Sequence, residues 1–205
     1  MITIKTLIGS LGLIGLFNGI AEANPSIIIE TLGEFPATKQ ALVRLTESSD
    51  LPLGLTAFGL GEFEGRGSQG FYSEVNLSKD IYSGIGGRLE WNGGSDITDV
   101  LRFGPTYTFK PLDELYLDFK AYPLNLSMDR KLVDPQIGLF ARLDLPREIY
   151  LENWTDLNIG DNALLQSELL VGKKLAERLS LQTGAIYNVS VPNKVEGRAG
   201  FRYEF

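Results

Sequence analysis

The chain has 205 residues, a formal net charge of −7 at pH 7, 43% hydrophobic residues and 23 glycines, but no histidine and no cysteine. These absences exclude disulfides, thiolate or imidazole metal ligands, and catalysis that relies on a Cys–His or Ser–His pair. The acidic balance argues against sequence-independent nucleic-acid binding, which needs a basic surface. We therefore expect no cofactor, no metal site and no nucleic-acid partner.

The first 23 residues have the pattern of a targeting segment. Lys5 precedes a run from Thr6 to Ile20 that carries no charge, and the small-x-small triplet 21–23 follows. This order is typical of a Sec-type signal peptide, and the run is shorter than the roughly 20 residues that a membrane-spanning helix needs. We expect cleavage after Ala23, which leaves residues 24–205 as one mature domain. An uncleaved anchor or a buried helix is the alternative.

After residue 23 the dominant hydrophobic period is two, which indicates β-strands. Two weaker candidates come first, at 26–35 and 39–47, although a helix over 38–47 also fits the second. Ten clearer strands begin near Pro52. The apolar positions of one of them are Leu101, Phe103, Pro105, Tyr107 and Phe109. These strands of about ten residues are long for a soluble sheet and match the 9–11 residues that a tilted strand needs to cross a bilayer.

The breaks between strands form two sets that alternate along the chain. One set has a polar or charged centre between apolar flanks, as tight turns do; its members are 77–84, 109–115, 143–149 and 172–179. The other set is looser and rich in Gly, Asn and Ser; its members are 64–70, 92–98, 125–134, 158–162 and 191–194. Strict alternation predicts an up-and-down meander with the tight turns at one end and the looser loops at the other.

The pattern predicts an all-β fold, a closed antiparallel up-and-down transmembrane β-barrel. We favour twelve strands over ten, and ten over eight; with an even number both termini lie at the same end. Closure follows from the physics of the bilayer, where every backbone N–H and C=O group must be paired. The alternative is a soluble β-sandwich or a lipocalin-like cup, which turns its apolar face inward.

The C-terminal sequence VEGRAGFRYEF carries a resemblance to a known class of protein. Its alternate positions are apolar or glycine, and it ends on Phe201, Tyr203 and Phe205. Together with the signal peptide and the strand repeat, this ending resembles the bacterial outer-membrane β-barrel proteins. The resemblance implies a location in the outer membrane, contact with outer-membrane lipid, and an assembly signal at those three residues for the barrel-assembly machinery. In size the chain resembles the compact twelve-stranded porins, such as the oligogalacturonate and sialic-acid channels, which are lined with basic residues.

The inward face, in contrast, is mixed in sign, with nine acids and seven bases. Its lumen-lining candidates are Arg88, Glu90, Arg102, Asp118, Lys120, Arg142, Asp144, Glu168, Arg198, Arg202 and Glu204, and the same parity adds Glu30, Arg44, Glu62, Glu74 and Glu152. In a narrow barrel these charges would pair into a plug, because an unpaired buried charge is costly. In a wider barrel, facing acids and bases would set a transverse field across a small pore. Inward glycines such as Gly138 and Gly172 favour the water-filled lumen.

The function that fits best is a small porin-like channel for passive diffusion of small polar solutes, with little ion selectivity. The alternative is a non-conducting structural, adhesion or interaction barrel that is anchored in the outer membrane. We do not expect an enzyme, because outer-membrane enzymes of this architecture typically use a histidine and this chain has none. The solute, the oligomeric state and the surface partner do not follow from the sequence.

Overall fold

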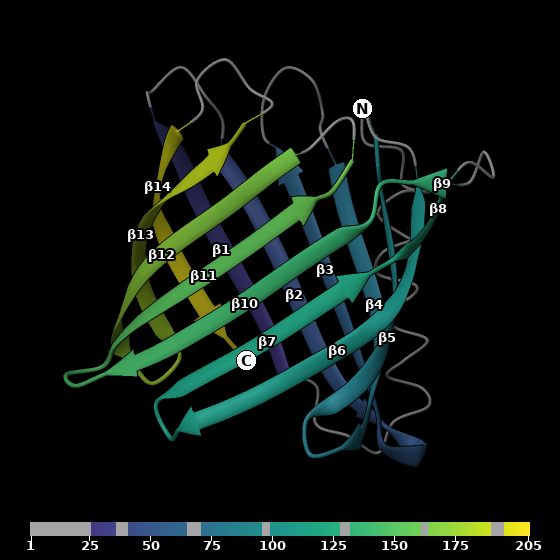
Figure 1. Ribbon diagram of the computed structural model, residues 1–205. Coiled ribbons are helices and arrows are strands. Elements are labelled where there is room, and N and C mark those ends of the chain that lie inside the picture. Colours follow the sequence, from purple (N-terminus) through teal and green to yellow (C-terminus); the bar gives the residue numbers. More distant parts are fainter. Residues whose placement is uncertain are drawn as a thin grey trace.

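The computed structural model describes residues 26–35, 41–64, 71–95, 99–127, 132–160, 164–189 and 195–205. These residues form one sheet that closes on itself (Figure 1). The strands are β1 (Ser26–Phe35), β2 (Ala41–Leu51), β3 (Leu55–Glu64), β4 (Phe71–Tyr82), β5 (Ile85–Gly94), β6 (Val100–Leu112), β7 (Leu115–Tyr122), β8 (Leu124–Ser127), β9 (Leu132–Val133), β10 (Gln136–Leu145), β11 (Ile149–Asn158), β12 (Leu164–Ala176), β13 (Leu179–Asn188) and β14 (Val195–Glu204).

Twelve of these strands make a closed antiparallel up-and-down barrel, which confirms the predicted class and strand number. Each barrel strand pairs with its neighbours along the chain, and β1 pairs with β14 from Ile28↔Glu204 to Phe35↔Gly197 to complete the ring. The backbone N–H of Phe205 donates to the carbonyl oxygen of Ile27 at 2.9 Å. The last strand therefore ends in mid-sheet because it pairs with the first.

The sequence allows either a helix or a strand over 38–47, and the structure shows a strand. Residues 41–51 form β2, not a helix, and β2 pairs with both β1 and β3. The connection to β3 is a 3₁₀ turn at Pro52–Gly54, in which Leu53 and Gly54 have φ of 68° and 70°. Two successive residues in the left-handed region reverse the chain within three residues, and a glycine adopts that conformation without strain.

The short connections lie together at one end of the barrel, at the bottom of Figure 1. They join β2 to β3, β4 to β5, β6 to β7, β10 to β11 and β12 to β13. β1 begins at this end and β14 ends at it, as the even strand number requires. The predicted tight turns are confirmed at this end. Most of the looser segments lie outside the described residues, and the loop predicted at 125–134 is wrong in part, because β8 and β9 overlap it.

One irregularity separates β7 from β8. Pro123 interrupts the strand, and β6 then pairs with β7 over Thr106–Leu112 and with β8 over Val100–Phe103. The parity of the buried residues changes across the break, since Tyr122 is buried before it and Asn125 after it. A side chain at Gly104 would run into the carbonyl of Ala121, so only glycine allows β6 to bend against this break.

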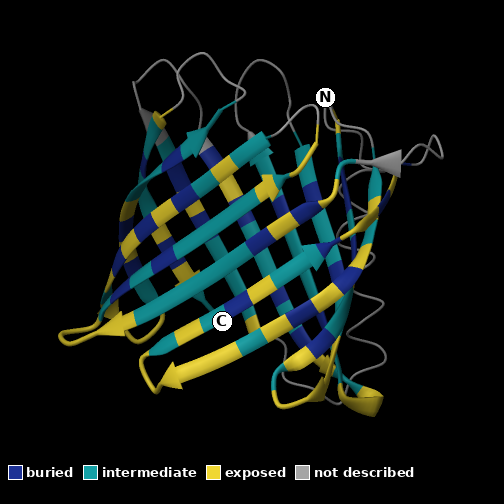
Figure 2. Cartoon of the chain, viewed as in Figure 1, coloured by how far each residue is buried: buried dark blue, intermediate teal, exposed yellow. Residues whose placement is uncertain are grey.

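The barrel is charged inside and apolar outside. Its buried set is dominated by polar side chains such as Glu90, Glu152 and Gln182, whereas Phe103 and Leu124 are 57% and 59% exposed on the outer surface. Buried and exposed residues alternate along the front strands (Figure 2). A β-sandwich or a lipocalin-like cup has the opposite arrangement, so that alternative is wrong.

Two further points concern the membrane segments expected from the sequence. The predicted signal peptide, residues 1–23, lies outside the described residues. Within the described ranges, no helix has the length and hydropathy to cross a bilayer.

Candidate functional site

One side of the barrel interior is held together by an arginine that reaches three carboxylates. The Arg44 guanidinium lies 3.3 Å from Glu30, 2.6 Å from Glu62 and 2.7 Å from Glu168. Arg44 is on β2 and Glu168 is on β12, and the strands β1, β14 and β13 lie between them in the ring. A contact between such distant strands can only pass through the interior, so these side chains span part of the lumen.

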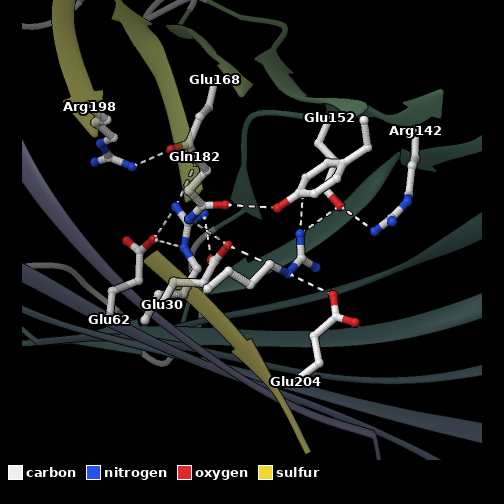
Figure 3. A network of polar contacts seen from close by, with 11 residues as sticks. Glu30, Glu62, Arg142, Glu152, Glu168, Gln182, Arg198 and Glu204 are labelled. Carbon is white, nitrogen blue, oxygen red and sulfur yellow. Dashed lines mark hydrogen bonds and ion pairs between the residues drawn. The ribbon is translucent and has the colours of Figure 1, made fainter. Parts of the chain in front are cut away.

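The contacts of Arg44 extend into a larger network, whose residues lie on both sides of the β1–β14 pairing (Figure 3). Arg198 donates to Glu168 at 2.6 Å, and Glu152 accepts from Arg142 and Arg202, both at 2.8 Å. Both guanidinium groups lie over the Tyr150 ring, that of Arg142 at 4.8 Å and that of Arg202 at 5.5 Å from its centroid. We call this set the seam network; it comprises Glu30, Arg44, Glu62, Arg142, Tyr150, Glu152, Glu168, Gln182, Arg198, Arg202 and Glu204.

A second group of charges lies on the far wall, on β4 to β7 and on β11. Its centre is Glu90, which is fully buried and accepts from Tyr122 at 2.7 Å, from Asn92 at 2.9 Å and from Lys120 at 3.3 Å. We call it the opposite cluster; it comprises Tyr72, Glu74, Arg88, Glu90, Asn92, Arg102, Asp118, Lys120, Tyr122 and Asp156. Most of its ion pairs cross a single intervening strand, as the 2.7 Å pair of Arg88 with Asp118 does.

Each group mixes both signs. The seam network holds four arginines and five glutamates, 4 − 5 = −1, and the opposite cluster holds three bases and four acids, 3 − 4 = −1. The acids and bases therefore pair within each group along its own wall. The described residues therefore do not form one acidic wall and one basic wall, and the transverse field stays a prediction.

The structure places all eleven predicted lining residues on the inward face. The seam network contains Arg142, Glu168, Arg198, Arg202 and Glu204; the opposite cluster contains Arg88, Glu90, Arg102, Asp118 and Lys120; Asp144 pairs with Arg142 at 3.1 Å near the turn end. Sequence reasoning missed Asp156, which has the same parity as Glu152, and the tyrosines Tyr122 and Tyr150. The same alternation finds Asp156 when it is followed along β11 past Glu152, and it finds the two tyrosines when it is applied to aromatic positions.

The predicted assembly residues lie on the other face. Phe201, Tyr203 and Phe205 are exposed on the outside of β14 and beyond its end, and the rings of Tyr203 and Phe205 meet at 4.7 Å. Such aromatics at a strand end match the interfacial girdle of membrane barrels. Their role in assembly stays a prediction.

The inward glycines serve packing and do not leave open space. A Cβ at Gly172 would run into the Tyr150 ring, and one at Gly138 would run into the Lys120 side chain. At Gly184 and Gly200 a Cβ would meet a backbone carbonyl of the neighbouring strand. The glycines thus allow the two charged groups and the strands to pack closely, and they give no support to the expected water-filled lumen.

Space is nevertheless present between the two groups. A cavity of about 430 Å³ is lined by polar residues of both walls and by aromatic rings. Glu30, Arg44 and Arg202 line it from the seam network, and Arg88, Asp118 and Lys120 line it from the opposite cluster. Of the described residues, none on β12 or β13 lines this cavity, which is therefore displaced away from those two strands.

No protein-family model matches the chain, and no curated protein matches it in sequence. Solved structures are similar in fold. A KdgM porin in complex with disordered oligogalacturonate has a TM-score of 0.62 at 13% identity, covering 88% of this chain and 99% of that chain. Another structure of KdgM porin has a TM-score of 0.61 at 12% identity with the same coverage. At this level of identity the likeness shows the fold, a compact porin-type barrel.

Proposed function

We propose that the protein is a small porin-like channel of the bacterial outer membrane, through which small polar solutes diffuse passively. The observation that carries the proposal is the cavity of about 430 Å³, lined by charged residues, inside a closed barrel with an apolar outer surface. Water and polar solutes are stable against such a lining, and hydrocarbon is stable against such an exterior. The fold likeness to KdgM porin adds support for the class.

The outer surface supports the membrane location. The twelve barrel strands have 8–13 residues each, and large apolar side chains such as Leu101, Ile137 and Leu181 are exposed on their outer faces. Strands of this length span the hydrocarbon core when they are tilted. A soluble protein seldom exposes so continuous an apolar surface. Export through the predicted signal peptide and insertion by the assembly machinery belong to the same proposal.

The mixed charge of the lining bears on the choice of solute. One structure of KdgM porin was determined with oligogalacturonate, an anionic sugar chain. In this chain the lining bases are paired with acids, as Arg88 is with Asp118 at 2.7 Å and Lys120 with Glu90 at 3.3 Å. Paired bases attract an anion weakly, so we propose small polar solutes without a preference for anions.

A non-conducting barrel is the second candidate, and the seam network favours it. Arg44, Glu168 and Arg198 are each at most 7% exposed, and their contacts fill one side of the lumen. If side chains also closed the remaining side, the barrel would serve as an anchor for a surface partner.

Conductance of the refolded protein in planar bilayers separates the two candidates. Folding is checked first by a heat-modifiable gel shift in detergent. A channel gives discrete open-state currents, and in a salt gradient its reversal potential lies close to zero because neither charge sign dominates the lining. Swelling of liposomes in small uncharged polyols gives an independent readout. Folded protein that shows neither current nor swelling would leave the anchor as the function.

A further inference from the structure

Four aromatic side chains that point into the barrel form a chain of ring contacts. The rings of Tyr116 and Phe140 meet at 5.9 Å, those of Phe140 and Trp154 at 4.3 Å, and those of Trp154 and Phe58 at 6.4 Å. All four line the central cavity. We call them the aromatic arc.

The last of these contacts joins opposite walls of the barrel. Phe58 is on β3 and Trp154 is on β11. In the ring of twelve strands, β2, β1, β14, β13 and β12 separate them on one side, and β4, β5, β6, β7 and β10 separate them on the other. With five strands on either route, the two positions are diametrically opposed. Two ring centroids 6.4 Å apart are within aromatic packing distance, so no water layer lies between the two rings.

The ring contact divides the lumen at this level. On the side of β12 and β13, the space is held by Tyr150, Leu170 and Gln182, each at most 1% exposed. The cavity lies along the other side, β4 to β10, and also reaches β1, β2 and β14, where Glu30, Arg44 and Arg202 line it. A solute that crosses the barrel must therefore pass beside the aromatic arc or displace one of its rings.

The chemistry at the Phe58–Trp154 contact differs from that of the rest of the lumen. The walls are lined by paired charges, whereas the bridge across the middle consists of two apolar ring faces. An apolar constriction resists hydrated ions, because they lose water there without gaining hydrogen bonds. Compact uncharged polar solutes carry less hydration and lose less when they pass.

We propose that the Phe58–Trp154 contact is the constriction of the lumen, and that these two rings set the size limit and favour small uncharged polar solutes over hydrated ions. The inference rests on the proposed channel function and deepens it. It assigns selectivity to a pair of aromatic residues and gives the seam network a structural role.

The experiment compares the wild type with Phe58→Ala, Trp154→Ala and the double variant. The matched control is Phe103→Ala, which removes an aromatic ring of the same size from the outer face of β6, where it is 57% exposed. We expect each ring deletion in the arc to raise single-channel conductance about twofold or more, because the apolar barrier is removed. The largest polyol that swells liposomes also becomes larger, while Phe103→Ala behaves as the wild type.

A cysteine variant keeps the test decisive if an alanine variant does not fold. The chain has no cysteine, so Phe58→Cys introduces a unique thiol. Its conductance is raised by the loss of the ring, and a bulky thiol-specific reagent added to the open channel lowers it again. Thr46→Cys, on the cavity wall but outside the arc, serves as the control and loses less current on modification.

The possible outcomes distinguish the constriction inference from the channel function. If the wild type conducts and both arc variants conduct equally, the constriction inference is wrong and the channel function stands. If the wild type and all folded variants are silent, the channel function fails and the inference fails with it. If the wild type is silent and the arc variants conduct, the rings close the lumen completely; the constriction is then upheld and passive diffusion through the wild type is refuted.

Discussion

Replacing Glu168 by glutamine tests whether the seam network holds the barrel closed. Each oxygen of this carboxylate accepts from a different arginine, Oε1 from Arg198 at 2.6 Å and Oε2 from Arg44 at 2.7 Å. Glutamine keeps one acceptor oxygen and presents an NH₂ group to the other guanidinium. Glu168→Gln thus removes the charge that both arginines share and sets two donors against each other.

The expected loss of stability depends on which carboxylates remain in contact with each arginine. Arg44 still has Glu30 and Glu62 within 3.3 Å, so its loss is partly compensated. For Arg198, the contact with Glu168 is a short ion pair in which both side chains are at most 8% exposed. Removing one partner of a buried pair costs about 3–5 kcal/mol. We expect Glu168→Gln to lower the free energy of unfolding by an amount in that range.

The assay is equilibrium unfolding in urea in the presence of lipid, followed by gel mobility and tryptophan fluorescence. The matched control is Glu204→Gln, since Glu204 contacts Arg202 at 3.3 Å but its side chain is 31% exposed. A pair that is partly screened by water contributes about 1 kcal/mol or less. The double variant Glu168→Gln with Arg198→Gln should recover part of the loss. A Glu168→Gln barrel within 1 kcal/mol of the wild type would refute the reasoning.

Two further predictions concern assembly and packing. Deleting Phe205 should impair insertion into the outer membrane while secretion across the inner membrane continues, as cell fractionation would show; normal insertion would contradict an assembly role for this residue. Gly200→Ala should destabilise the barrel by about 1–3 kcal/mol in urea, because its Cβ meets the carbonyl of Thr31 across the closing pair of strands. Gly59→Ala, which has open space around the new methyl group, is the control and should be tolerated; equal stability of the two variants would show that the β1–β14 approach is looser than described.

Much of the fold could be predicted because its signals are local. Period-two alternation and the two kinds of turn are readable within about ten residues, and each barrel strand repeats them. The weak N-terminal signal over 39–47 was ambiguous between helix and strand because its residues suit either. The sequence does not predict the break at Pro123, since the shift of the inward parity to Asn125 depends on how β6 bends at Gly104.

The interior could be predicted only as a set of residues. Alternation identified the inward charges but could not tell which of them meet, because that depends on the stagger of the strands round the barrel. Arg44 and Glu168 are 124 residues apart in the chain and touch only after closure. The contact of Phe58 with Trp154 has the same origin, and neither segment carries a local sign of it. The inward glycines suggest open space in the sequence, but side chains from neighbouring strands cover Gly138 and Gly172.

The central claim is that the apolar face meets lipid and the polar face encloses the lumen, and the two tryptophans of the chain test it directly. Trp91 is on the outer face of β5, whereas Trp154 lines the cavity inside β11. The variants Trp91→Phe and Trp154→Phe each keep one tryptophan, Trp154 and Trp91 respectively. Their fluorescence is measured after refolding into vesicles with brominated acyl chains. Lipid bromine should quench Trp91 strongly and leave Trp154 nearly unquenched. Equal or stronger quenching of Trp154 would contradict the account.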